Sequence, residues 1–124
     1  MKKNVKTVLC IDDDKDVLAF LKTVLKSGGF NFLEASNGRE GLIKFNEKEP
    51  DFVIVDLMME DVDAGLKLTQ EIRRVDNKVP IYMLSSVGNN LYSSVNTSYF
   101  GLTGVFQKPL KPKILLETIN SSLK

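Results

Sequence analysis

Three features of the sequence predict an α/β fold in which helices cover both faces of a parallel sheet. Short apolar segments alternate with longer amphipathic segments five times, and no linker interrupts the alternation. The segment Phe52–Val55 is apolar at every position, as expected for a central strand that is covered on both faces. With 43% hydrophobic and 27% charged residues, the composition is that of an ordinary globular protein. We therefore expect one domain over residues 1–124.

Five segments are expected to form the strands, because they are short, rich in apolar or β-branched residues, and bounded by turn residues or charges. These segments are Lys6–Ile11, Asn31–Ala35, Asp51–Val55, Val79–Leu84 and Gly104–Phe106.

Five amphipathic segments are expected to form the helices. They are Asp14–Lys26, Asn37–Glu47, Leu66–Arg74, a weaker segment at Asn90–Phe100, and Pro112–Leu123. Asp14 and Asn37 precede apolar helical patterns and have side chains suited to capping a helix. Pro112 suits a first helical turn, because that position needs no backbone N–H.

Charge and residue usage exclude several classes of function. The net charge of +1 predicts no bulk attraction to nucleic acid or to an anionic membrane. No segment approaches the ~20 apolar residues of a membrane span, and the apolar run Val8–Ile11 is too short for a signal peptide. The single cysteine, Cys10, cannot form an internal disulfide, which is typical of a cytoplasmic protein. Histidine is absent, so carboxylates must carry any chemistry.

Polar residues follow four of the five expected strands. They are Asp12, Asp13 and Asp14 after the first strand, Asp56 after the third, Ser85 and Ser86 after the fourth, and Lys108 after the fifth. The carboxyl ends of parallel strands meet at one edge of a sheet, where ligands of such folds bind. Clustered carboxylates repel one another unless a cation offsets their charge, and Mg²⁺ prefers oxygen ligands of this kind. A carboxylate at such a site can act as a nucleophile and form an acyl phosphate.

Each of these residues also has a purely structural interpretation. Asp14 is expected to cap the first helix, and Asp12 and Asp13 alone would fit a cap and a solvated turn. Asp56 alone would fit the start of a loop. We favour a site because complementary groups at the ends of four different strands are hard to explain as independent surface choices.

Four segments resemble the signature segments of response-regulator receiver domains from two-component signalling. They are VLCIDDD at Val8–Asp14, DFVIVDLMM at Asp51–Met59, VPIYMLSS at Val79–Ser86 and GVFQKPL at Gly104–Leu110. Their order is that of the family, and their spacing is nearly the same. The resemblance implies a flavodoxin-like, doubly wound sheet of five parallel strands in the order 2-1-3-4-5.

The resemblance also implies the roles of the acidic residues. Asp56 would be the phosphoacceptor, and Asp12 and Asp13 the acidic pair that binds the metal together with Asp56. The backbone carbonyl of Met58 would complete the protein's share of the metal shell. The metal would be Mg²⁺, with Mn²⁺ as a substitute.

Ser85 would be the switch hydroxyl and Lys108 the conserved lysine of the family, with a cis bond before Pro109. The implied phosphodonor is a sensor histidine kinase or a histidine phosphotransfer protein. An output domain or partner protein would contact the face of the fourth helix, fifth strand and fifth helix. Such a domain is a signalling module and not an enzyme that turns over an external substrate.

Two features depart from the family pattern. The loop from Met58 to Gly65 lacks the usual proline near Glu60 and is one residue longer than usual. Val105 occupies the position of the switch aromatic residue, and strand alternation should turn the neighbouring Phe106 to the other face. The sequence therefore argues against an aromatic rotamer change that is coupled to Ser85.

Three other functions fit the fold class less well. A phosphatase of the haloacid-dehalogenase type needs a second aspartate two residues after its nucleophile, where this chain has Met58. A flavodoxin needs a phosphate-binding loop after the first strand, and three aspartates there would repel the phosphate. A degenerate receiver that serves only for docking would not need the complete set of site residues.

Overall fold

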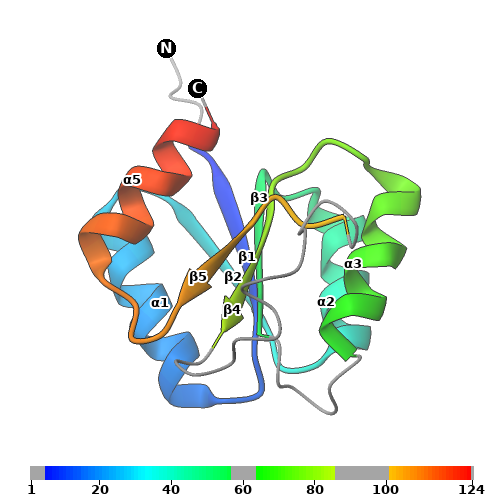
Figure 1. Ribbon diagram of the computed structural model, residues 1–124, viewed down its shortest axis with the longest axis horizontal. Coiled ribbons are helices and arrows are strands. Elements are labelled where there is room, and N and C mark those ends of the chain that lie inside the picture. The colour runs from blue at the N-terminus through cyan, green and yellow to red at the C-terminus, as the bar shows by residue number, and fades with distance from the viewer. Residues whose placement is uncertain (1–4, 57–63, 86–100, 124) are drawn as a thin grey trace.

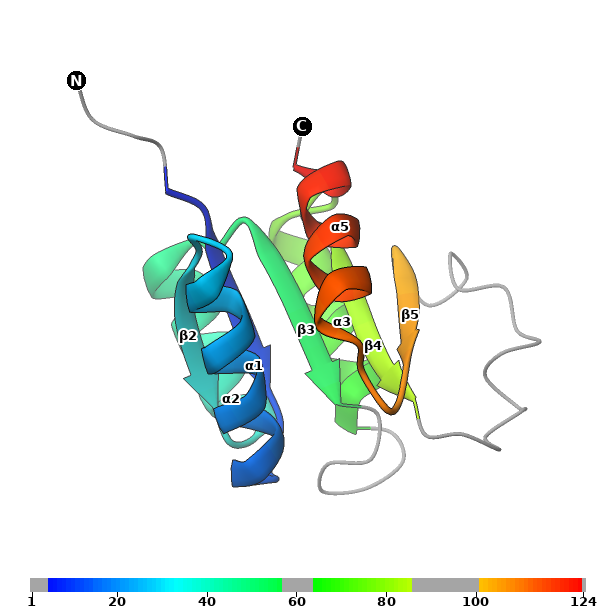
Figure 2. The ribbon, with the colours of Figure 1, turned by 90° about the vertical axis from the view of Figure 1, so that its left-hand side faces the viewer.

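The computed structural model describes residues 5–56, 64–85 and 101–123, which form one parallel sheet flanked by helices (Figure 1). The strand order is β2-β1-β3-β4-β5, which confirms the expected order 2-1-3-4-5. Helices α1 and α5 cover one face of the sheet, and α2 and α3 cover the other (Figures 1 and 2). The expected α/β fold, with helices on both faces, is confirmed.

The strands are β1 (Thr7–Ile11), β2 (Asn31–Ala35), β3 (Phe52–Asp56), β4 (Ile81–Ser85) and β5 (Gly104–Gln107). β4 begins two residues later than the sequence predicts. The reason is local, because the N–H of Val79 donates to the side chain of Asp76 and not to a neighbouring strand. β3 extends one residue further than predicted, because Asp56 pairs with Leu84.

The helices in the described part are α1 (Lys15–Ser27), α2 (Gly38–Lys48), α3 (Ala64–Val75) and α5 (Pro112–Ser122). The two predicted caps are present, since Asp14 accepts from the N–H of Asp16 and Asn37 accepts from the N–H of Glu40. The predicted helix at residues 90–100 lies outside the described residues.

The hydrophobic core has two halves, one on each face of the sheet. Residues of β1 and β3 alternate between them, so that Leu9 and Val53 pack toward α2 and α3 while Cys10 and Ile54 pack toward α1 and α5. All five residues of β3 are buried, which explains why its sequence shows no polar alternation. Cys10 is fully buried and packs as a small apolar residue.

All the ladders are parallel, so the strands end at the same edge of the sheet, at the bottom of Figure 1. Among the helices of the described residues, none combines the length and apolar character that crossing a bilayer requires.

Candidate functional site

A group of three carboxylates lies where β1 and β3 end. Asp12 follows β1 directly and Asp56 is the last residue of β3, and the preceding residues Ile11 and Val55 pair across the two strands. One carboxylate oxygen from each of Asp12, Asp13 and Asp56 lies within 4.8 Å of the other two. Asp12 and Asp56 are buried, with 0% and 5% of their surface exposed, while Asp13 is exposed.

The backbone and side chain of Asp12 are held by two hydrogen bonds. Its N–H donates to the carbonyl of Ala35 over 3.0 Å, and its Oδ1 accepts from the N–H of Asp14 over 2.9 Å. Within the described residues, the buried Oδ2 atom of Asp12 has no hydrogen-bond partner. A buried acceptor without a partner is costly, and a hard divalent cation that takes oxygen ligands would satisfy it. The residues present therefore fit Mg²⁺.

Burial and charge disfavour the ionised form of Asp12. Burial is the largest cause that raises the pKa of its carboxyl from 3.8 to about 7. The hydrogen bond from Asp14 opposes this shift, the charge of Asp56 raises the pKa further, and the charge of Lys108 lowers it. A cation beside Asp12 would supply the positive charge that keeps the carboxylate ionised near neutral pH.

Lys108 brings a positive charge to this group from the end of β5. Its Nζ lies 3.5 Å from Oδ1 of Asp56, and its side chain is 31% exposed. Its N–H donates to the carbonyl of Ser85 over 2.8 Å, and the bond to Pro109 is cis. The end of β5 is thereby held against the end of β4.

Ser85 is the last residue of β4 and is buried, with 2% of its surface exposed. Its neighbour Leu84 pairs with Asp56, so Ser85 lies at the same edge as the carboxylates. Met58, whose carbonyl the family resemblance implies as a metal ligand, lies outside the described residues.

A stack of three aromatic rings, which the sequence does not predict, lies on the α1 and α5 face of the sheet. Tyr82 stacks on Phe106 with ring centroids 4.8 Å apart and on Phe52 with centroids 5.2 Å apart. Phe106 therefore points away from the α2 and α3 face, as strand alternation predicts. Only the register of β3, β4 and β5 shows that these three residues can meet.

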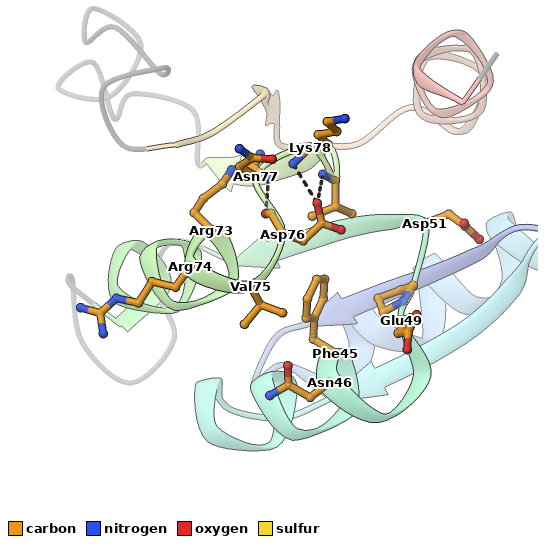
Figure 3. Close-up of a pocket in the computed structure, with 12 residues that line it drawn as sticks. Phe45, Asn46, Glu49, Asp51, Arg73, Arg74, Val75, Asp76, Asn77 and Lys78 are labelled. Carbon is orange, nitrogen blue, oxygen red and sulfur yellow. Dashed lines mark hydrogen bonds between the residues drawn. The ribbon is translucent and has the colours of Figure 1, made fainter.

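A cavity of about 740 Å³ lies at the opposite edge of the sheet, between the ends of α2 and α3 (Figure 3). Its lining includes Phe45 and Val75, three acidic residues and three basic residues. Opposite charges are balanced in it, and none of the site residues described above lines it. Among the described residues, the group of three carboxylates is therefore separate from this cavity.

Residues 8–120 match the response regulator receiver domain family, and the chain belongs to that family. It is 33% identical over 124 residues to the probable transcriptional regulator ycf27 of Porphyra purpurea, covering 100% of this chain and 50% of that protein. It is 36% identical over 113 residues to the transcriptional regulatory protein PrrA of Mycobacterium tuberculosis, covering 90% of this chain and 46% of that protein. The chain thus spans about half the length of these relatives.

Solved structures show the same fold. The crystal structure of a response regulator receiver domain protein from Clostridium thermocellum has a TM-score of 0.86 at 27% identity, covering 96% of this chain and 94% of that one. The chemotaxis response regulator CheY4 of Vibrio cholerae has a TM-score of 0.85 at 27% identity, covering 97% and 100%. The chain is therefore a receiver domain of the kind found in two-component response regulators, and such domains are signalling domains.

Proposed function

We propose that residues 1–124 form one phosphoacceptor domain, in which Asp56 accepts a phosphoryl group in a Mg²⁺-dependent reaction and thereby switches the output. The observation that carries the proposal is the surroundings of Asp56. Carboxylates of Asp12 and Asp13 lie close enough to share a cation with it, and the ammonium group of Lys108 lies 3.5 Å from its Oδ1.

In the proposed reaction, a carboxylate oxygen of Asp56 attacks the phosphorus of the donor and forms an acyl phosphate. The bond between phosphorus and the donor's leaving atom breaks, and the leaving group takes that electron pair. Asp12, Asp13 and Asp56, with the carbonyl of Met58, would hold Mg²⁺, which supplies positive charge beside the phosphoryl oxygens when bound. Lys108 would pair with a phosphoryl oxygen and stabilise the charge that develops during transfer.

The phosphodonor lies outside residues 1–124. The chain contains no histidine and so cannot form a phosphohistidine of its own. A sensor histidine kinase or a histidine phosphotransfer protein is the class of donor that fits. The output domain or protein partner would contact the face that includes β5 and α5, where Lys108 connects the two elements.

Intact mass after incubation with acetyl phosphate and Mg²⁺ tests this proposal. The wild-type protein is expected to gain one phosphoryl group, and Asp56→Asn none, because an amide cannot form the acyl phosphate. Asp16→Asn removes an exposed carboxylate from the first turn of α1 and is expected to be labelled like the wild type. Equal labelling of Asp56→Asn and wild type would contradict the assignment of Asp56.

A further inference from the structure

The backbone of α2 lies directly on the side chain of Ile11 at Gly41. Gly41 is buried, and a Cβ atom at this position would lie 2.7 Å from Cδ1 and 2.9 Å from Cγ1 of Ile11. Real Cβ atoms do not approach other carbons this closely, so a methyl group at position 41 would force Ile11 or α2 to move.

Ile11 has little freedom to move away from such a methyl group. It is the last residue of β1, is 1% exposed, and pairs with Ala35 on one side and Val55 on the other. It also packs within the core half beneath α2 and α3. Because protein interiors are close-packed, a displacement of this side chain is transmitted to the strand that carries it.

The strand end that Ile11 occupies also fixes Asp12. Asp12 is bonded to Ile11, its N–H donates to the carbonyl of Ala35, and its Oδ1 accepts from the N–H of Asp14. A shift of the end of β1 therefore changes the distance between the carboxylates of Asp12 and Asp56. This distance must be short if both carboxylates are to bind one cation.

We propose that Gly41 is a positioning residue for the cation site: the close approach of α2 to Ile11 sets where β1 ends and so places the Asp12 carboxylate beside Asp56. This inference rests on the proposed Mg²⁺ site. Gly41 contacts neither the cation nor the phosphoryl group and acts through Ile11.

The test compares the Mg²⁺ dissociation constants of variants, measured from NMR amide shifts during titration with MgCl₂. Gly41→Ala is expected to weaken binding by about tenfold, a loss typical of changes to groups that hold metal ligands. The double variant Gly41→Ala/Ile11→Val adds one methyl group to α2 and removes one carbon from β1. The carbon removed is Cδ1 of Ile11, the atom that would lie closest to the new Cβ atom. The double variant is expected to recover part of the lost Mg²⁺ binding, because a γ carbon of residue 11 remains 2.9 Å from the new Cβ atom.

Gly38→Ala is the matched control, since it makes the same change in the same helix. A Cβ atom at position 38 would find its nearest neighbour, Cβ of Leu68, at 4.0 Å, so Mg²⁺ binding is expected to stay at the wild-type value.

If Gly41→Ala does not fold, Ile11→Val alone, which loosens the same contact, is expected to weaken Mg²⁺ binding. Ile81→Val removes a methyl group from the same core half at the other end of the sheet and should leave binding unchanged.

Two results would overturn the inference while leaving the proposed function intact. One is a Gly41→Ala protein of reduced thermal stability that binds Mg²⁺ as tightly as the wild type, which would make Gly41 a packing residue only. The other is a Gly41→Ala protein with weakened Mg²⁺ binding in which adding Ile11→Val brings no recovery at all. A wild-type protein that binds no Mg²⁺ would overturn both this inference and the proposed metal site.

Discussion

The two carboxylate oxygens of Asp12 have different surroundings. Oδ1 accepts from the N–H of Asp14, whereas Oδ2 is buried without a hydrogen-bond partner in the described part of the chain. The hydrogen bond from Asp14 orients the carboxylate, and one of its oxygens lies within 4.8 Å of a carboxylate oxygen of Asp13 and of Asp56. The proposed cation site would thus depend on a backbone hydrogen bond at the start of α1 as well as on the acidic residues themselves.

The raised pKa of Asp12 has a consequence for stability in the absence of metal. The folded protein binds a proton at Asp12 more tightly than the unfolded chain does, because the pKa rises from 3.8 to about 7 on folding. Protonation of Asp12 therefore stabilises the fold fully below about pH 4, and this contribution is lost as the pH rises through about 7.

We predict that Asp12→Asn, which is neutral at every pH, loses this pH dependence. In EDTA, the free energy of unfolding of the wild type should fall relative to that of Asp12→Asn as the pH rises from about 4 to about 8. Urea unfolding curves at each pH measure the difference, in which the titration of groups far from Asp12 cancels, whereas Asp56 and Lys108, whose charges act on Asp12, remain coupled to it. A difference that stays constant over this range would show that folding does not raise the pKa of Asp12.

The identities of the acidic residues could be predicted because they depend on a simple rule. Asp12, Asp13 and Asp56 each follow or end an apolar strand, and parallel strands place such residues at one edge. The contact between Gly41 and Ile11 could not be predicted, because it depends on how α2 is rotated against β1. The orientation of Asp12 also depends on a hydrogen bond that a residue pattern does not show.

At the scale of secondary structure elements, the periodicity of apolar residues predicts which segments form strands and helices. Local hydrogen bonds explain where the observed ends differ from the predicted ones. β2 has the predicted limits. β4 does not, because the Asp76 side chain takes the N–H groups of Lys78 and Val79 before the strand begins. Such competition between a side chain and a strand ladder is specific to one turn.

The end of α2 contains a strained residue that a substitution can relieve. Glu49 follows α2 in the left-handed region with φ 48°, which favours glycine because a Cβ atom is crowded there. We predict that Glu49→Gly raises the free energy of unfolding by about 1 kcal/mol, while Glu49→Ala, which keeps the Cβ atom, does not. Urea unfolding of the three proteins measures this, and an equal or lower stability of Glu49→Gly would contradict it.

At the scale of the whole molecule, the candidate site and the cavity of Figure 3 lie at opposite edges of the sheet. The strands connect these edges, and the carboxylates, Ser85 and Lys108 all lie at the carboxyl edge. The site residues come from the ends of four different strands, so the site exists only when the sheet is assembled. The chain spans about half the length of the curated relatives it matches.

The most direct test of the account is to locate the phosphoryl group. Borohydride reduces an aspartyl phosphate to homoserine, which peptide mass spectrometry can assign to one position. After incubation with acetyl phosphate, we predict homoserine at position 56 when Mg²⁺ is present and none when EDTA replaces it. Homoserine at another aspartate, or at position 56 to the same extent in EDTA, would contradict the proposal that Asp56 accepts a phosphoryl group beside a cation held by Asp12 and Asp13.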